Sequence, residues 1–583
     1  MRLLWSALLR AALPTLLLAP CLAHAAAPAA VEAAHGMVVS AQRLATEAGV
    51  AMLEAGGNAV DAAAAVGYAE AVVNPCCGNL GGGGFMTLRM ADGRAVFVNF
   101  RETAPASASA GMYLDAAGKP IKDASLFGWR AAGVPGTVAG LDMARAEYGR
   151  MSRAQVMASA IRLARDGFTL TRGDTDILQL GIARFRANPV LAAIFLRPDG
   201  TPLAPGDRLV QRDLAATLDA IAQGGPDAFY RGGFAHALAD AAQGALTEAD
   251  LAAYRVTESA PIACAYRGAS ILSAAPPSSG GVTLCEILDI LSGYDLRALG
   301  FHSAASVHLM TEAMRHAFLD RNTTLGDPAF VANPLDRLLS PAYAAAIRAQ
   351  IGPRATPSRD LSAASAPHEK PETTSFAVVD AAGNAAAVTY TLNGAFGAYA
   401  MPPGTGVLLN DEMDDFTVAP DTPNLFGLVQ GPRNAIAPHK RPLSSMAPTI
   451  VLRDGQVALV LGSPGGSRII SIVLEVILNM LDYGMTPQEA VDAPRLHHQY
   501  LPDTLFAEPF ALSPDTAALL RGMGYTITEQ TPWGDAEMIA RVVHPEAGAA
   551  SSGNDAALSG GMRPGLLYGA HDSRRPAGAA LGY

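Results

Sequence analysis

Two adjacent threonines, Thr373 and Thr374, stand where a charged, proline-bearing stretch gives way to an apolar run, in KPETTSFAVVD (370–380). A threonine hydroxyl is a weak nucleophile unless a base lies beside it, and the α-amine of an N-terminal threonine is such a base. Thr373 is therefore a candidate nucleophile that becomes active if the Glu372–Thr373 bond is cut. Taken alone, a Thr-Thr pair more often only begins a β-strand, because threonine favours strands.

A glycine-rich loop provides a second candidate. The segment GSPGG (462–466) is predicted to join a strand to the N-terminus of a helix, where backbone N–H groups lack partners and lie at the positive end of the helix dipole. No Lys-Ser/Thr pair follows the loop, and GNLGGGGF (78–85) lacks the G-x-G-x-x-G spacing. Stabilisation of an oxyanion is therefore favoured over phosphate or dinucleotide binding, although a tight structural turn explains the segment equally well.

Three charged side chains would suit a ligand with an amino-acid head. Arg101 offers a planar fork for a carboxylate, and Glu412 and Asp415 in NDEMDDF (410–416) can hold an ammonium group. Each of these charges, taken alone, is more often a surface charge. Their use in binding therefore depends on the fold bringing them together.

Neither a metal nor a cofactor is indicated. The sequence HEKPE (368–372) does not have the H-E-x-x-H spacing, and His497-His498 has no acidic or cysteine neighbours. The 42 basic and 53 acidic residues give a net charge of -11 without a basic stripe, which argues against a nucleic-acid partner.

The elements that must position these residues follow from local patterns. A buried helix is predicted over 56–73, with Asn58 as N-cap and Asp61 three residues later. A hairpin is predicted over 81–105 around Asp92-Gly93, and its second strand ends at Arg101. The first part of the chain, to about residue 350, is otherwise predicted to be mostly helical.

The later part of the chain has a different character. After an exposed connector over 351–372, which would tolerate a break, two strands are predicted over 374–392 and a hairpin over 447–466. The apolar helix expected over 467–481 is too short and too charged to span a bilayer. With 50% hydrophobic and 16% charged residues among 583, the chain can bury a large core. Because neither part can close a core alone, we expect one layered α+β body, although length by itself suggests about four domains.

The N-terminus resembles a secretory signal peptide. Arg2 and Arg10 accompany an apolar run that ends in Ala23-His24-Ala25, so we expect residues 1–25 to be removed and the protein to be periplasmic or secreted. A lipoprotein anchored at Cys21 and an uncleaved membrane anchor are the alternatives.

Of the five cysteines, Cys21 belongs to the signal peptide. A disulfide between the adjacent Cys76 and Cys77 forms only with strain, and the sequence leaves undecided whether Cys264 pairs with Cys285. We expect a hydrophobic core, not disulfides, to hold the protein together.

Several segments together resemble the γ-glutamyltranspeptidases of the N-terminal-nucleophile hydrolase superfamily. They run in family order from about residue 36 to the C-terminal LGY, and RPLSSM and GSPGGSRI are long and specific. The matching segments are GGNAVDAA (56–63), GGGGFM (81–86), FRETAP (100–105), GVPGTVAG (133–140), ETTSFAVVD (372–380), VTYTLN (388–393), LLNDEMDDF (408–416), RPLSSMAPTIV (441–451), GSPGGSRII (462–470) and APRLHHQ (493–499).

The resemblance implies a four-layer αββα sandwich, made jointly by a large subunit (26–372) and a small subunit (373–583) after self-cleavage between Glu372 and Thr373. It also implies a role for each matching residue. In order these are Thr373 as nucleophile, Thr391 as its support, Gly465 and Gly466 as oxyanion-hole amides, Arg101, Ser444 and Ser445 for the substrate α-carboxylate, Glu412 and Asp415 for its α-amino group, and Asn393 as a further substrate contact.

The implied activity is cleavage of γ-glutamyl amides such as glutathione, with transfer to water or to amino acid and peptide amines. Phe426, in a segment resembling a lid loop (419–428), replaces the tyrosine of other members. Three alternatives stay open: a glutaryl-type cephalosporin acylase, a periplasmic amino acid or peptide binding protein without catalysis, and an inactive relative that only processes itself. Retention of Asp415 favours a γ-glutamyl donor, because a glutaryl group has no α-amine.

Overall fold

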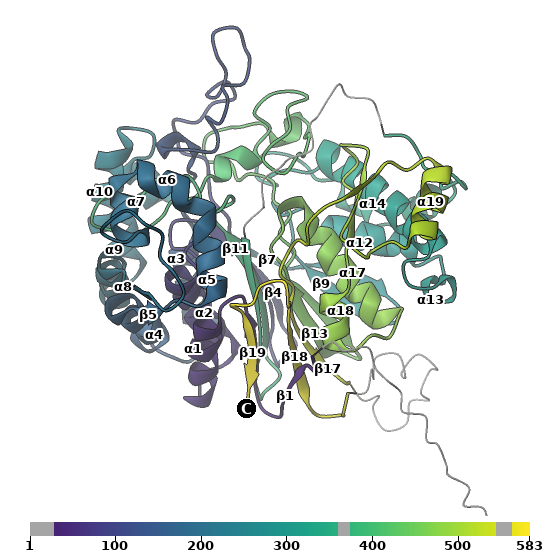
Figure 1. Cartoon of the computed structure of the whole chain (residues 1–583), viewed down its shortest axis with the longest axis horizontal. Helices are drawn as coiled ribbons and strands as arrows, with labels where there is room; N and C mark the ends of the chain where they lie inside the picture. The colour runs from purple at the N-terminus through teal and green to yellow at the C-terminus, as the bar shows by residue number, and fades with distance from the viewer. Residues whose placement is uncertain (1–27, 359–372, 544–561) are drawn as a thin grey trace, which may run out of the picture.

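Two seven-stranded sheets are stacked face to face at the centre of the molecule, and helices cover the outer face of each (Figure 1). The computed structural model describes residues 28–358, 373–543 and 562–583. The four layers follow the order αββα, as predicted from the resemblance.

The first sheet carries the predicted nucleophile. Its neighbouring strands are all antiparallel, and the predicted hairpin over 81–105 and strand pair over 374–392 both lie within it. In spatial order the strands are β19 (Ala579–Gly582), β2 (Met37–Ser40), β10 (Thr373–Val379), β11 (Ala385–Thr391), β3 (Gly83–Arg89), β4 (Ala95–Phe100) and β7 (Thr257–Ser259).

The second sheet contains the predicted hairpin over 447–466, whose turn is Asp454-Gly455. Its strands are β1 (Val31–Ala33), β18 (Leu567–His571), β17 (Glu537–Arg541), β13 (Gln456–Gly462), β12 (Thr449–Arg453), β9 (Ala269–Ser273) and β8 (Ile262–Tyr266). Two small sheets complete the β-structure, one of β14 (Leu496–His497), β15 (Leu505–Ala507) and β16 (Ile527–Glu529), the other of β5 (Phe168–Thr169) and β6 (Arg208–Leu209).

Successive side chains along a strand belong to different layers of the core. In β10, Ala377 and Val379 join the apolar cluster between the two sheets, whereas Phe376 and Val378 join the cluster beneath the helices. Successive side chains of a strand point to opposite faces, and both faces are covered here. This explains why β10 reads as a continuous apolar run and not as an alternating one.

The N-terminal helices cover the first sheet. All fifteen residues of α2 are buried, and Asn58 and Asp61 form the predicted capping box at its start. The helices of this layer are α1 (Arg43–Glu54), α2 (Ala59–Val73), α3 (Thr137–Tyr148), α4 (Arg153–Asp166), α5 (Arg172–Leu178), α6 (Ile182–Ala187), α7 (Pro189–Phe195), α8 (Arg212–Gly224), α9 (Pro226–Tyr230), α10 (Gly233–Ala242) and α11 (Glu248–Ala253).

The remaining helices lie on the side of the second sheet. They are α12 (Gly280–Leu291), α13 (Leu296–Leu299), α14 (Ala304–Thr324), α15 (Leu335–Leu338), α16 (Pro341–Arg348), α17 (Ile469–Leu481), α18 (Pro487–Asp492) and α19 (Pro514–Met523). Short 3-10 turns are η1 (Trp129–Ala131), η2 (Gln179–Gly181), η3 (Glu412–Asp415), η4 (Pro432–Asn434) and η5 (Gly466–Arg468). Within the described ranges, no helix is both long enough and apolar enough to cross a membrane.

Both sheets contain strands from before residue 359 and strands from after residue 372. In the first sheet, β10 and β11 lie between β2 and β3, and in the second, β12 pairs with β9 and β18 with β1. The expectation of one body is therefore confirmed. The predicted cleavage residue Glu372, the signal peptide and Cys21 lie outside the described residues.

The cysteines differ from the prediction. Disulfides join Cys76 to Cys77 and Cys264 to Cys285, so covalent links accompany the hydrophobic core. The second bridge connects β8 to α12, with Cα atoms 5.8 Å apart, a separation that only the fold could establish.

Candidate active site

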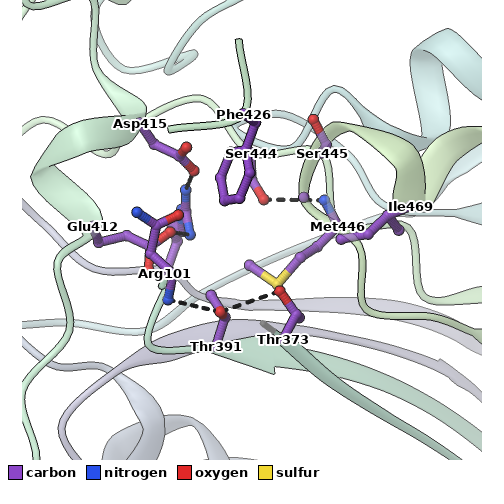
Figure 2. A pocket seen from close by; sticks show the side chains of 12 residues that line it. Arg101, Thr373, Thr391, Glu412, Asp415, Phe426, Ser444, Ser445, Met446 and Ile469 are labelled. Atoms are coloured by element: carbon purple, nitrogen blue, oxygen red, sulfur yellow. Dashed lines mark hydrogen bonds and ion pairs between the residues drawn. The ribbon is translucent and has the colours of Figure 1, made fainter. Parts of the chain in front are cut away.

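A pocket opens at the end of the first sheet and brings together nearly all the predicted site residues (Figure 2). Of the predicted catalytic and substrate-binding residues, only Gly465 is absent from its wall. The lining consists of Arg101, Thr373, Thr391, Asn393, Glu412, Asp415, Phe426, Ser444, Ser445, Met446, Gly466 and Ile469.

Thr373 and Thr391 face each other across the pair β10–β11. They are register partners at the ends of their strands, and their Oγ1 atoms lie 3.2 Å apart. The Asn393 N–H donates to Thr391 Oγ1 at 2.7 Å. Because this bond occupies a lone pair of Thr391 Oγ1, the Thr391 hydroxyl can direct its proton at Thr373 Oγ1. That hydrogen bond would stabilise negative charge developing on Thr373 Oγ1.

Arg101, at the end of β4, is fully buried and bonded to both acids predicted to bind an ammonium group. It donates to the Glu412 carboxylate and, through Nη2, to Asp415 Oδ2 at 2.5 Å. Burial opposes the charge on Arg101, but the carboxylates of Glu412, Asp415 and Glu102 outweigh it and raise the pKa of the guanidinium. The clamp predicted for a zwitterion is thus a cation paired with two acids.

The acids around Arg101 leave buried acceptor atoms without donors. Within the described chain, Glu412 Oε2 and both oxygens of Glu102 have no hydrogen-bond partner. Burial raises the pKa of Glu102 to about 7, against the lowering effect of Arg101, and it also raises the pKa of Glu412. An ammonium group carries three N–H donors and would satisfy the Glu412 oxygen that lines the cavity.

Ser444 and Ser445 are held by groups that the sequence did not indicate. The Ser444 N–H donates to the Pro277 carbonyl at 3.0 Å, and Ser445 Oγ accepts from Arg321 Nη2 at 2.8 Å. Arg321 lies on α14, and burial lowers its pKa to about 10. Nothing in its local sequence marks it, because its partners Ser279, Gln430 and Ser445 come from distant segments. Arg321 therefore joins Arg101 as a second buried cation near the predicted carboxylate subsite.

The glycine loop has the predicted position between β13 and α17, with η5 as its first turn. Gly465 and Gly466 have positive φ angles of 145° and 57°, which favour glycine. Among the described residues, neither N–H donates to a protein acceptor. Only Gly466 reaches the wall of the cavity, so the expectation of an oxyanion site rests more directly on this residue.

The lid-like loop over 419–428 contributes to the wall of the cavity. Asn424 Nδ2 donates to Asp415 Oδ1 at 3.1 Å, and the Phe426 ring lines the cavity. Gln499 was not predicted to act here, yet its Nε2 donates to the Phe426 carbonyl at 3.0 Å and its Oε1 accepts from Ser467 at 2.6 Å. Gln499 therefore ties the lid-like loop to the turn that follows the glycine loop.

Comparison with known proteins identifies the family. Residues 45–580 match the gamma-glutamyltranspeptidase family. The chain belongs to the γ-glutamyltranspeptidase family. This match confirms the resemblance found in its motifs and the prediction that the chain is an enzyme of this family.

Individual γ-glutamyltranspeptidase relatives extend over nearly the whole chain. The chain is 51% identical to a glutathione hydrolase proenzyme of Pseudomonas sp. (strain A14), covering 96% of each chain. It is 44% identical to the glutathione hydrolase proenzyme of Escherichia coli (strain K12), covering 98% of this chain and 99% of the relative. The crystal structure of a cephalosporin acylase from Bacillus halodurans is 26% identical and superposes with a TM-score of 0.81 over 96% of this chain and 98% of that one. These likenesses confirm the N-terminal-nucleophile hydrolase fold.

Proposed function

We propose that this enzyme is a self-processing γ-glutamyltransferase and hydrolase whose nucleophile is Thr373. Its proposed substrates are γ-glutamyl amides such as glutathione, and its acceptors are water and the amines of amino acids or peptides. The observation that carries the proposal is the single cavity that contains both Thr373 and the clamp of Arg101, Glu412 and Asp415. The names of the two relatives as glutathione hydrolase proenzymes support it.

Maturation is the first proposed reaction. Thr373 Oγ1 attacks the carbonyl carbon of Glu372, the C–N bond breaks, and the acyl group passes to the oxygen as an ester. Water hydrolyses this ester and leaves Glu372 as a C-terminal carboxylate and Thr373 with a free α-amine. The products are a large subunit (26–372), after loss of the signal peptide and export, and a small subunit (373–583), which stay together as a heterodimer.

Catalysis then uses the new α-amine as general base. Thr373 Oγ1 attacks the γ-carbonyl of the donor, the N–H groups of Gly465 and Gly466 stabilise the oxyanion, and the amine of the leaving group takes up the proton. The resulting γ-glutamyl-Thr373 ester is attacked by water or by an acceptor amine. Thr391, through its hydrogen bond to Thr373 Oγ1, supports the charge on that oxygen.

The α-amino acid head of the donor fits the charges around the cavity. Its carboxylate would bind Arg101, Ser444 and Ser445, and its ammonium group would bind Glu412, Asp415 and the Asn393 side chain. Arg101 is already paired with both acids. On binding, the carboxylate of the donor would become the partner of Arg101, and the ammonium group of the donor would become the partner of the two acids. A donor lacking the α-amine would leave the acids without a new partner.

Self-cleavage and turnover test the proposal directly. On a denaturing gel the purified wild type should give two chains, whereas Thr373→Ala should remain one. Thr374→Ala is the matched control and should split normally. Mass spectrometry should place Thr373 at the new N-terminus, and incubation with glutathione should release glutamate, or a γ-glutamyl tripeptide when glycylglycine is added. An intact wild-type chain, or a Thr373→Ala chain cut at the same bond, would overturn the assignment.

A glutaryl-type acylase activity is the second candidate, favoured by the likeness to the cephalosporin acylase structure. The two activities differ in the α-amine of the substrate. Rates on a γ-glutamyl anilide and a glutaryl anilide separate them, and we expect hydrolysis of the first and little of the second. A reversed preference would assign the chain to the acylases.

A further inference from the structure

A buried group of potential metal ligands lies outside the cavity, where β17 and β18 meet. Glu537 and His571 are register partners on these strands, and Asp535 lies two residues before Glu537. One donor atom from each of the three side chains falls within 4.8 Å of the other two. Asp535 and Glu537 are 2% and 0% exposed, so the two carboxylates share a nearly dry environment.

The two distances from the histidine nitrogen to the carboxylates are short enough for a common ion. His571 Nδ1 lies 2.9 Å from Glu537 Oε1 and 3.9 Å from Asp535 Oδ1. Zinc bonds to nitrogen and oxygen are about 2.0–2.2 Å long, so two ligands of one ion lie up to about 4.2 Å apart. Both distances fall within that limit without movement of the backbone.

Two features of the side chains point to a missing ligand. Asp535 Oδ1 is buried and, within the described chain, has no hydrogen-bond partner, which is costly for a carboxylate. His571 Nε2 lies 2.5 Å from the Arg575 carbonyl and donates its proton there. This orientation directs Nδ1 at the two carboxylates, and a backbone carbonyl commonly fixes the ring of a metal-bound histidine in this way.

Two of the nearby cations are paired with other acids. Arg495 and Arg574 both contact Asp572, and Arg574 also pairs with Glu508. A divalent ion with neutral His571 would balance Asp535 and Glu537 and would relieve the cost of burying them.

We propose that Asp535, Glu537 and His571 bind one divalent transition-metal ion of the Zn²⁺ class. An imidazole nitrogen with two carboxylates suits Zn²⁺ or Mn²⁺ better than Mg²⁺ or Ca²⁺, which prefer oxygen ligands alone. On binding, Nδ1 gives any proton it carries to solvent and its lone pair to the ion.

The site would stabilise the strand end that carries the glycine loop. Glu537 is the register partner of Gly462, and the Asp535 N–H donates to Ser463 Oγ at 3.3 Å. An ion held by β17 and β18 would therefore fix the start of the 462–466 loop. Its role is structural, because neither Asp535, Glu537 nor His571 lines the cavity.

Metal content and metal-dependent stability test the site without reference to activity. Untagged mature protein is purified without chelator and measured by elemental mass spectrometry. It is then treated with EDTA, dialysed and titrated with Zn²⁺ by calorimetry and thermal unfolding. We expect about one ion per heterodimer and a higher melting temperature with Zn²⁺, as for structural zinc sites. A wild type that retains no metal and gains no stability from Zn²⁺ would overturn the proposal and leave His571 as a buried imidazolium paired with Glu537.

Three variants locate the binding. Asp535→Asn and His571→Gln should bind Zn²⁺ at least about tenfold more weakly, because loss of an outer partner of a ligand alone costs about 10–100-fold. His236→Gln breaks an exposed His–Glu pair of similar geometry, 2.7 Å from Glu248, and should bind like wild type. Equal Zn²⁺ binding by wild type and Asp535→Asn would show that the ion lies elsewhere and the assignment is wrong. If the variants do not fold, the wild-type titration alone decides.

Discussion

The ring of Phe426 occupies the space that a side chain at Gly466 would need, since a Cβ built there would lie 2.4 Å from Phe426 Cδ1. The lid-like loop and the glycine loop can therefore meet only because position 466 is a glycine. Gly466 also has a φ of 57°, so both its backbone and its contact depend on the missing side chain.

Gly466→Ala should disrupt the active site more than it disrupts the fold. The added methyl group must displace Phe426 or the loop itself, and a misplacement of about 1 Å can cost about 100-fold in rate. We expect a loss of that order in kcat on a γ-glutamyl anilide. Gly455→Ala is the control, because Gly455 has a φ of 74° and no atom within 4 Å of its Cβ position. Equal losses of activity in both variants would attribute the effect to backbone strain and not to Phe426.

Thr391→Val should slow both maturation and turnover. Valine preserves the shape of the side chain but removes the hydroxyl 3.2 Å from Thr373 Oγ1. Loss of one donor to a developing oxyanion costs about 100- to 1,000-fold in kcat, and KM should change little. Thr391→Ser keeps the hydroxyl and should retain most of the activity. A Thr391→Val enzyme as fast as Thr391→Ser would remove Thr391 from the mechanism; kinetics and a time course of self-cleavage on gels measure both effects.

Asp415→Asn should weaken recognition of the α-ammonium group. A hydrogen bond to a charged group contributes about 1.5–3 kcal/mol, so kcat/KM on a γ-glutamyl anilide should fall by about 10- to 100-fold. The slow rate on a glutaryl anilide should not fall, because that substrate lacks the amine. Asp421→Asn removes an exposed carboxylate from the lid-like loop and should leave both rates unchanged. Parallel losses on the two anilides would mean that Asp415 acts on the fold and not on the amine.

Glu102 should make stability depend on pH. Burial raises its pKa from 4.5 to about 7, so between these values the folded protein holds a proton that the unfolded chain releases. The stabilisation of the fold that comes from this retained proton is complete below pH 4.5 and is lost as pH rises through 7. Between pH 5 and pH 8, the melting temperature of wild type should therefore fall more than that of Glu102→Gln. Glu529→Gln, at an exposed position, should follow wild type; a pH profile of Glu102→Gln that parallels wild type would contradict the assignment.

Local patterns predicted the elements and most of the site. The Asp92-Gly93 turn, the Asn58 cap and the strand pair that begins at Thr373 each depend on neighbouring residues, so the sequence itself contains the information. The motifs of the family resemblance then indicated which charges converge on the cavity. They did not indicate that Arg101 would pair with both Glu412 and Asp415.

Residues whose function depends on distant partners could not be predicted. Arg321 meets Ser445 across 124 positions of the chain, and Gln499 meets Phe426 across 73. His571 and Glu537 are 34 residues apart, so no short motif shows that they face each other across two strands. Sheet pairing and helix packing create these contacts, and only the folded structure reveals them.

Both sheets contain strands from each side of the proposed cut, and this has a consequence for assembly. If the proposed cut follows folding, the two subunits are already paired in the same sheets when the cut creates them. They therefore do not have to find each other by diffusion. Their pairing then requires no encounter and is independent of protein concentration. Separation would expose the edges of β2, β3 and β9 at once, so the heterodimer should dissociate only by unfolding.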